Sequence, residues 1–327
     1  MPPISVVIPL YNKGPHIART INSVLAQTVT DFEIVVVDDG STDNGTDIVA
    51  SFNDPRIRLI RQVNQGVSAA RNRGISEARS DFIAFLDADD EWAPDHLETL
   101  LRLRSKFPEA GAYTTAYVRV LPGGEILSSK FKAIPPAPWE GVIPDYFKAA
   151  ALGDPPVCSS AVGIPKKVFD EVGLFKVGVK MGEDLDQWLR IALAYPIVFS
   201  WSGFAWYRMD SKERVCETNE SDYTLIIEKC IEAIKYGQQS HNEQGIKLFL
   251  EKFGRTHVRS LIRQHEPERA RVYISRIEKV LEKKGLLLKE FAFSYLPAKL
   301  FDFLLGVKRS TRNCLFLLII LAKKFFC

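Results

Sequence analysis

The chain has 327 residues, of which 46% are hydrophobic and 25% charged, so it can bury a substantial core and is neither disordered nor fibrous. Its five cysteines, at positions 158, 216, 230, 314 and 327, show neither CxxC spacing nor a cluster with histidine. This spacing argues against a disulfide framework or a zinc site. We therefore expect a reducing, cytoplasmic setting, and the N-terminus shows no pattern of a secretory signal.

The net charge of +3 is unevenly distributed along the chain. Counting Lys and Arg against Asp and Glu gives −4 for residues 1–215 and +7 for residues 216–327. An acidic first part suits a cation as its ligand, whereas a basic part rich in Leu and Phe suits an anionic lipid surface. No basic-aromatic signature or zinc-finger spacing points to nucleic acid, so we expect no nucleic-acid partner.

The first hundred residues alternate short apolar runs with segments of helical period. Strands are expected at residues 4–10, 33–37, 57–61 and 82–86, and the first, second and fourth are almost entirely apolar. Between them, apolar residues recur at helical spacing over residues 17–25 and 67–78. This alternation predicts βαβ units and a mostly parallel sheet that is covered on both faces.

Prolines interrupt residues 121–156, where only a short helix near residues 145–152 is expected. Regular structure is expected again at 157–164, in a helix at 184–194 and in a strand at 197–201. After Cys216 the pattern is helical, with apolar stripes at Leu225, Ile226, Cys230 and Ile234 and at Val272, Ile277, Val280 and Leu281. We predict an α/β domain over residues 1–215, divided near residue 120, and a helical C-terminal region over residues 216–327.

Polar residues follow three of the expected strands, at residues 9–12, 38–43 and 87–90. Ligands of an open parallel sheet bind beyond the carboxyl ends of its strands. The sequence therefore brings Tyr11 and several carboxylates to one rim of the sheet.

Asp87 and Asp89 are alternate residues, so in extended backbone their side chains share a face. Their mutual repulsion is relieved if a cation joins them, and hard oxygen ligands suit Mg²⁺ or Mn²⁺, which keep open positions for diphosphate oxygens. The alternative is the start of a helix, with acids before the first turn and Pro94 as its first residue.

The other motifs also have two interpretations each. Asp38 and Asp39 either shape a turn with Gly40 or accept hydrogen bonds from a nucleoside. Arg71, one turn into its helix, suits either a structural salt bridge or an anionic ligand. Glu183 and Asp184 stand at the start of a helix, where acids also serve as caps.

Five segments, taken in this order, resemble glycosyltransferase family 2 over about residues 3–210. They are VVIPLYN at 6–12, VVVDDGSTD at 35–43, NQGVSAARNRGI at 64–75, FLDADD at 85–90 and GEDLDQWLR at 182–190. The resemblance implies a Rossmann-like GT-A fold, a nucleotide-diphosphate sugar donor, Mg²⁺ or Mn²⁺, and inversion at the anomeric carbon.

The same resemblance assigns roles by position. The nucleotide base is expected at Pro9, Tyr11, Asp39 and Arg71; the ribose and metal at Asp87; the metal mainly at Asp89; the catalytic base at Asp184; and the acceptor region at Glu183 and Trp188. The helical stripe also places Trp188 on the buried face. The QxxRW motif of processive members is absent, which favours transfer of a single sugar. A UDP-sugar donor and a hydroxyl acceptor, such as a lipid-linked saccharide in cell-envelope synthesis, are expected.

Two other classes compete with this interpretation. A metal-dependent nucleotidyltransferase would use Asp87 and Asp89 but would not need Glu183 and Asp184. A receiver-like module would end near residue 120 and leave residues 157–210 unexplained. The sequence has neither a Walker A run nor a GxGxxG after the first strand, so a phosphate-loop or dinucleotide site lacks its basic feature.

The segment 286–327 is rich in Leu and Phe and carries Lys308, Arg309 and Arg312. Its apolar run at 314–322 is too short to span a bilayer, which takes about 20 residues. We expect an interfacial helix on the cytoplasmic face of an anionic membrane, with docking on protein or a dimer interface as the alternative.

Overall fold

The computed structural model describes residues 1–179, 181–210, 222–237, 243–287, 290, 291 and 294. The chain divides into two compact units. The first comprises residues 1–219 with 239–245, and the second comprises residues 220–238 with 246–327.

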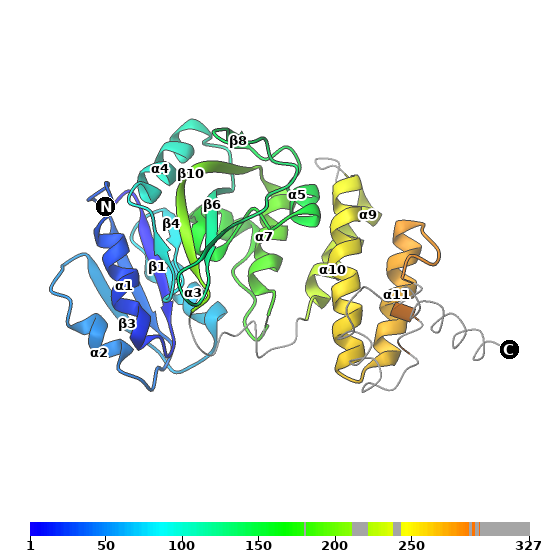
Figure 1. Ribbon diagram of the computed structural model, residues 1–327, viewed down its shortest axis with the longest axis horizontal. Helices are drawn as coiled ribbons and strands as arrows, with labels where there is room; N and C mark the ends of the chain where they lie inside the picture. Colours follow the sequence, from blue (N-terminus) through cyan, green and yellow to red (C-terminus); the bar gives the residue numbers. More distant parts are fainter. Residues whose placement is uncertain (180, 211–221, 238–242, 288–289, 292–293, 295–327) are drawn as a thin grey trace. The chain divides into compact units, whose positions relative to one another are not determined.

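Within its described residues, the first unit contains a ten-stranded sheet in the order β3-β2-β1-β4-β9-β6-β10-β5, with β7 beside β6 and β8 beside β10 (Figure 1). The strands are β1 (Ser5–Leu10), β2 (Glu33–Asp38), β3 (Ile57–Arg61), β4 (Phe82–Phe85), β5 (Glu91–Trp92), β6 (Ala112–Val120), β7 (Ile126–Ser128), β8 (Glu140–Val142), β9 (Val162–Pro165) and β10 (Ile197–Arg208). Strands β3, β2, β1 and β4 are all parallel, so their carboxyl ends meet at one edge. Strand β9 then runs antiparallel to both β4 and β6.

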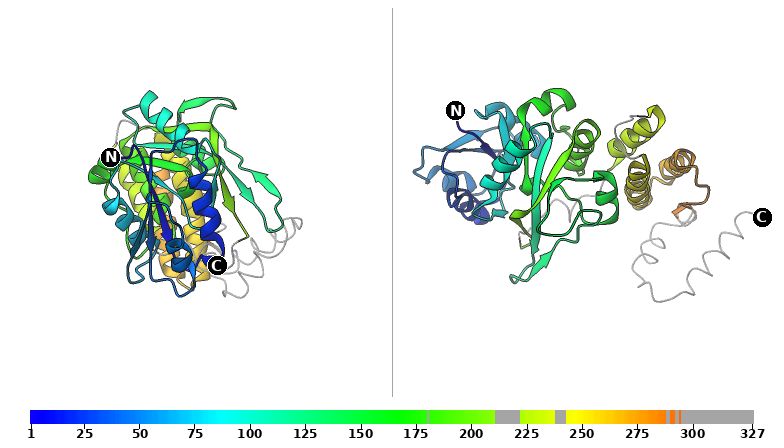
Figure 2. Two further views of the ribbon diagram at one scale, coloured as in Figure 1. Left: turned by 90° about the vertical axis from the view of Figure 1, so that its left-hand side faces the viewer. Right: turned by 90° about the horizontal axis from the view of Figure 1, so that it is seen from above.

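Helices cover this sheet on both faces (Figure 2). They are α1 (Gly14–Leu25), α2 (Gly45–Ala50), α3 (Val67–Glu77), α4 (His96–Lys106), α5 (Tyr146–Leu152), α6 (Lys166–Val172) and α7 (Glu183–Ala194), with a 3₁₀ turn at Ser159–Ala161. Side chains alternate along β1, so Val6 joins a buried cluster with Ile17 of α1, whereas Val7 faces Gly74 of α3. A Cβ on Gly74 would lie 2.2 Å from Val7 Cγ1, so glycine lets α3 approach the sheet closely.

The expected α/β class is confirmed, as are the four strands and the helices at residues 17–25, 67–78, 145–152 and 184–194. The structure adds the nine-residue strand β6, which the sequence pattern did not indicate, and α4 begins at His96, two residues after the Pro94 at which a helix start was the alternative interpretation. It also places the short strands β7 and β8 in the proline-rich stretch, and extends the expected strand at 197–201 to Arg208.

The described part of the second unit is helical, as expected, with α9 (Thr224–Tyr236), α10 (Glu243–Arg263) from Ile246 onward, and α11 (Pro267–Leu281). Two residues of the expected apolar stripes, Leu225 and Val272, are exposed. The other stripe positions Ile226 and Cys230 on α9, and Ile277 and Leu281 on α11, are buried as predicted.

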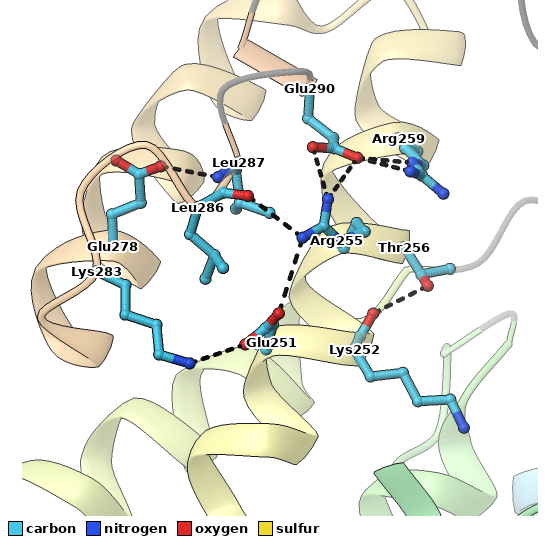
Figure 3. A network of polar contacts seen from close by, with 10 residues as sticks. All are labelled: Glu251, Lys252, Arg255, Thr256, Arg259, Glu278, Lys283, Leu286, Leu287 and Glu290. Carbon is cyan, nitrogen blue, oxygen red and sulfur yellow. Dashed lines mark hydrogen bonds and ion pairs between the residues drawn. The ribbon is translucent and has the colours of Figure 1, made fainter. Parts of the chain in front are cut away.

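A buried carboxylate anchors the segment after α11 to α10 (Figure 3). Both Glu290 oxygens lie 3.0 Å from Arg255 Nη1, and Arg259 Nη2 donates to Glu290 Oε1 at 2.7 Å. Arg255 also donates to the Leu286 carbonyl at 3.3 Å. Leu286, Leu287 and Glu290 are therefore part of the packed helical unit.

None of the helices in the described ranges combines the length and the hydropathy needed to cross a membrane. Most of the expected membrane-associating segment, residues 295–327, lies outside the described residues.

Candidate active site

The loop that follows β4 is fastened to α1 by its backbone. The Thr20 hydroxyl lies 2.9 Å from the Ala88 carbonyl oxygen and 2.8 Å from that of Asp90. Arg19 donates to the Asp89 carbonyl oxygen at 3.1 Å. Thr20 has one hydroxyl hydrogen to share between its two carbonyl partners, and together with Arg19 it fixes where the carboxylates of this irregular loop stand.

The loops after β1 and β2 are also tied together. Asn12 Oδ1 accepts from the Thr42 backbone N–H at 2.8 Å, and Ser41 Oγ accepts from the Asn12 N–H at 3.1 Å. Asn12 has a φ of +51°, which an asparagine tolerates better than most residues. The preceding Tyr11 is 48% exposed at the rim, whereas Pro9 lies buried within β1.

Asp38 and Asp39 hold neighbouring backbone. Asp38 Oδ1 accepts from the Ser41 N–H at 2.9 Å, so its turn-shaping interpretation is confirmed. Asp39 accepts from the Gln62 side chain at 2.7 Å and from the N–H groups of Gln65 and Gly66 at 3.0 and 2.8 Å. Since these bonds use three of about four acceptor positions, a base contact at Asp39 has one position left and stays a prediction.

Arg71 joins two carboxylates from distant parts of the chain. The residue is 3% exposed, with Nη1 2.9 Å from Glu183 Oε1 and Nη2 3.0 Å from Asp87 Oδ1. Burial alone lowers the pKa of Arg71, but the charges of Asp87, Glu183 and Asp184 more than offset it and raise the pKa. The salt-bridge interpretation of Arg71 is therefore confirmed, and the bridge lies within the expected site.

A phenylalanine supports this bridge. Arg71 Cζ lies 5.4 Å from the centroid of the Phe175 ring. Asn72, the next residue of α3, binds the Phe175 backbone in both directions, accepting from its N–H at 3.0 Å and donating to its carbonyl at 2.8 Å. Trp188 packs edge-on against the same ring at 5.9 Å and is only 1% exposed. Trp188 can therefore support Arg71 through Phe175, but its buried ring offers no open platform to an acceptor.

Asp184 is the second residue of α7 and follows Glu183 directly. Its Oδ1 accepts from the Leu185 N–H at 2.7 Å. Burial, followed by the charge of Glu183, outweighs the opposing effect of Arg71 and raises the pKa of Asp184 to about 7. A carboxylate that titrates near neutral pH is suited to accept a proton from a hydroxyl group.

Gln187 and Arg190 secure this helix. Gln187 donates to the Gly173 carbonyl at 3.0 Å, and Arg190 donates to the Val172 carbonyl at 2.6 Å and to Asp186 at 2.9 Å. Their contacts are thus structural, and they fix the start of α7 through the loop after α6.

Asp89 and Asp90 have different environments. Asp89 Oδ2 forms an ion pair with Lys13 Nζ at 2.8 Å, and both side chains are partly accessible. Asp90 is buried and accepts from Ser160 Oγ at 2.5 Å and from the Arg208 N–H at 2.8 Å. Burial, followed by the negative charges of Asp89 and Asp87, raises the pKa of Asp90. Asp90 therefore holds the loop to β10, and the contacts of Lys13 and Ser160 were not indicated by the sequence.

The oxygen atoms of Asp87 and Asp89 fit a hard divalent cation. In the bonds of the described residues, each carboxylate uses one oxygen in an ion pair, with Arg71 and Lys13 respectively. No group of three or more Asp, Glu, His or Cys residues in the described ranges is arranged to hold a metal ion. Two carboxylates leave the remaining positions to water and diphosphate, which is the usual pattern for Mg²⁺. The metal stays a prediction.

The known proteins that this chain resembles are glycosyltransferases. A family model described as "Glycosyl transferase family 2" matches residues 5–173. The chain is 46% identical over 102 residues to the uncharacterized glycosyltransferase YibD of Escherichia coli K12, which is 31% of this chain and 30% of that protein. It is 30% identical over 202 residues to an uncharacterized glycosyltransferase of Rickettsia felis, which is 61% of this chain and 33% of that protein. The chain thus spans about a third of the length of these curated relatives.

Residues 1–349 of TarS from S. aureus, solved in complex with UDP-GlcNAc, have a similar structure. The TM-score is 0.63 at 16% identity, over 89% of this chain and 90% of that one. At this identity the likeness shows the fold alone, and it confirms the expected GT-A fold.

Proposed function

The chain belongs to glycosyl transferase family 2, and from this membership we propose that it transfers a single sugar from a nucleotide-diphosphate sugar to a hydroxyl acceptor. The observation that carries the proposal is the Arg71 bridge. One buried guanidinium draws Asp87, at the end of β4, to Glu183, the neighbour of Asp184. The expected donor carboxylates and the expected base therefore stand on either side of one cation.

The residues divide the reaction between them. Asp87 and Asp89 would hold Mg²⁺ or Mn²⁺, which would supply positive charge to the departing diphosphate. Arg71 adds a fixed cation beside them that needs no reorganisation during the reaction. Asp184, whose pKa of about 7 leaves much of it ionised at neutral pH, takes the proton of the acceptor hydroxyl. The acceptor oxygen then attacks the anomeric carbon from the face opposite the leaving diphosphate, which inverts its configuration.

We assign a UDP-sugar as the donor class, with Tyr11 at the face of the base and Asp39 at its edge. The exposure of Tyr11 and the UDP-GlcNAc in the TarS complex support this assignment. The acceptor is a hydroxyl of a lipid-linked or other envelope saccharide on the cytoplasmic side. The lack of a QxxRW motif supports single transfer.

Binding of nucleoside diphosphates tests the donor class. We expect UDP with Mn²⁺ to raise the melting temperature of the full chain more than GDP, dTDP or CDP, because a ligand stabilises the state that binds it. Product analysis then separates the two enzyme classes. Release of nucleoside diphosphate supports sugar transfer, whereas release of pyrophosphate would establish the nucleotidyltransferase alternative.

A further inference from the structure

Lys13 stands where a cation is expected. Its Nζ lies 2.8 Å from Asp89 Oδ2, and the two side chains are 21% and 15% exposed. Asp89 is the carboxylate assigned to the metal, so the ammonium group and a divalent cation are both attracted to the same carboxylate. Both cannot approach Asp89 closely without repelling each other.

The backbone on both sides of this pair is fixed. Asn12, directly before Lys13, is bonded to Ser41 and Thr42, and the N–H of Gly14, directly after it, donates to Asp43 Oδ2 at 2.7 Å. The Asp89 backbone is held by Arg19. The contact therefore follows from the fold, and the flexible stem of the lysine is the part that can move.

Arg71 differs from Lys13 in this respect. Its planar guanidinium binds two carboxylates at once and rests against Phe175, and the residue is 3% exposed. Lys13 pairs with Asp89 through a partly accessible ammonium on a flexible four-carbon stem. Of the two cations at the expected metal carboxylates, Lys13 is the one that can be displaced.

We propose that Lys13 is a positioning residue that couples binding of the divalent cation to binding of the nucleoside diphosphate. The inference rests on the proposed function. Without diphosphate, the ammonium group stays on Asp89 and opposes the metal ion. When metal and diphosphate arrive together, Lys13 leaves Asp89 and donates to diphosphate oxygens on the same rim. Each ligand therefore binds more tightly in the presence of the other, by the same factor.

The experiment measures Mn²⁺ affinity of the full-length protein by electron paramagnetic resonance of free Mn²⁺, alone and with the best-binding nucleoside diphosphate. For the wild type we expect a coupling of about 5- to 150-fold. Lys13→Met should bind Mn²⁺ alone about tenfold more tightly and lose most of the coupling, while Lys13→Arg retains it. Lys13→Gln is a second neutral variant, in case Lys13→Met folds poorly. Lys106→Met is the matched control, because Lys106 pairs with Glu140 away from the site.

The outcomes distinguish the two proposals. If the wild type binds Mn²⁺ but none of the nucleoside diphosphates binds to it, the proposed function and this inference are both overturned. A wild type with clear coupling that Lys13→Met and Lys13→Gln leave unchanged would overturn the role of Lys13 alone. Tighter Mn²⁺ binding in both neutral variants but not in Lys106→Met supports it.

Discussion

Arg71 Nη1 lies 2.9 Å from Glu183 Oε1, although 112 residues separate the two in the sequence. The same guanidinium binds Asp87, so one side chain of α3 joins the end of β4 to the start of α7. The contact is at once a structural bridge and a source of positive charge in the expected site. Substitutions should therefore affect stability and reaction together.

Arg71→Met should lower the free energy of unfolding by about 3 kcal/mol, near the lower bound for breaking a buried ion pair, because Asp87 keeps some access to water. Arg73→Met is the control on the same helix. Arg73 is 52% exposed and pairs only with Glu77 among its described ion pairs, so its loss should cost less than about 0.5 kcal/mol. Urea denaturation measures both values, and equal effects would show that the bridge contributes no more than a surface pair.

Asp184 should give the reaction an ascending pH limb centred near pH 7. Burial and Glu183 raise the pKa of Asp184 to about 7, and the base acts only when it is ionised. Glu183→Gln removes the repelling charge, so the limb should move to lower pH. Asp184→Asn should lose transfer by about 10²- to 10⁴-fold while nucleoside diphosphate still binds. Initial rates from pH 5 to 9 test this, and an unmoved limb in Glu183→Gln would contradict the assignment.

The same shift makes Asp184 a cost to stability at high pH. A carboxyl group whose pKa is higher in the folded than in the unfolded state holds its proton more tightly when folded, so its ionised form destabilises the fold. Asp184→Asn should raise the melting temperature at pH 8. The gain should shrink as the pH falls from about 7 towards 4, where wild-type Asp184 becomes protonated in both states. A gain that is independent of pH would point to packing rather than charge.

Asp89 is the expected metal ligand, whereas its neighbour Asp90 holds the loop to β10, so substitutions of the two should have different effects. Asp89→Asn should abolish Mn²⁺-dependent transfer. It should lower the free energy of unfolding by less than about 1 kcal/mol, because only a partly exposed ion pair is lost. Asp90→Ala leaves Ser160 Oγ and the Arg208 N–H without their carboxylate, at about 1–3 kcal/mol for each. Mn²⁺ binding and urea denaturation are measured on both. Normal metal-dependent transfer in Asp89→Asn would remove the site assignment.

The parts of the fold that the sequence predicted are those with a strong local pattern. Strands β1, β2 and β4 are continuous apolar runs because helices cover both faces of the sheet. Strand β6 was missed because its buried positions include Thr114 and Thr115. Thr114 is satisfied there by the carbonyls of Pro156 and Ala161, at 3.1 and 2.9 Å, and such distant partners leave no local signal.

In the candidate site, too, the sequence predicted the features that have a local pattern but not those that depend on the tertiary fold. The convergence of carboxylates at one rim followed from strand ends, and parallel β1, β2 and β4 confirm that geometry. The partners of individual charges did not follow, because Glu183 and Lys13 reach Arg71 and Asp89 only through the tertiary fold. The helical period had already placed Trp188 on the buried face of α7, and that local pattern was a better guide to its position than its expected acceptor role.

The last prediction concerns the basic, apolar segment at residues 286–327. We expect the full chain to sediment with phosphatidylglycerol vesicles at low salt but not with phosphatidylcholine vesicles, since each basic residue near an anionic surface contributes about 1 kcal/mol. The position of a truncation matters. Glu290 is buried against Arg255 and Arg259, so removing residues 286–327 also removes their carboxylate partner.

A chain ending at Ser294 should therefore keep the wild-type urea midpoint of the helical unit and lose vesicle binding. A chain ending at residue 285 should lose about 2 kcal/mol of stability as well, less than for a fully buried pair because both arginines are partly exposed. Glu290→Gln in the full chain is the control, since it weakens the anchor but leaves the basic segment intact. If the full chain ignores anionic vesicles, or if the chain ending at Ser294 still binds them, the segment is a protein-docking element rather than a membrane anchor.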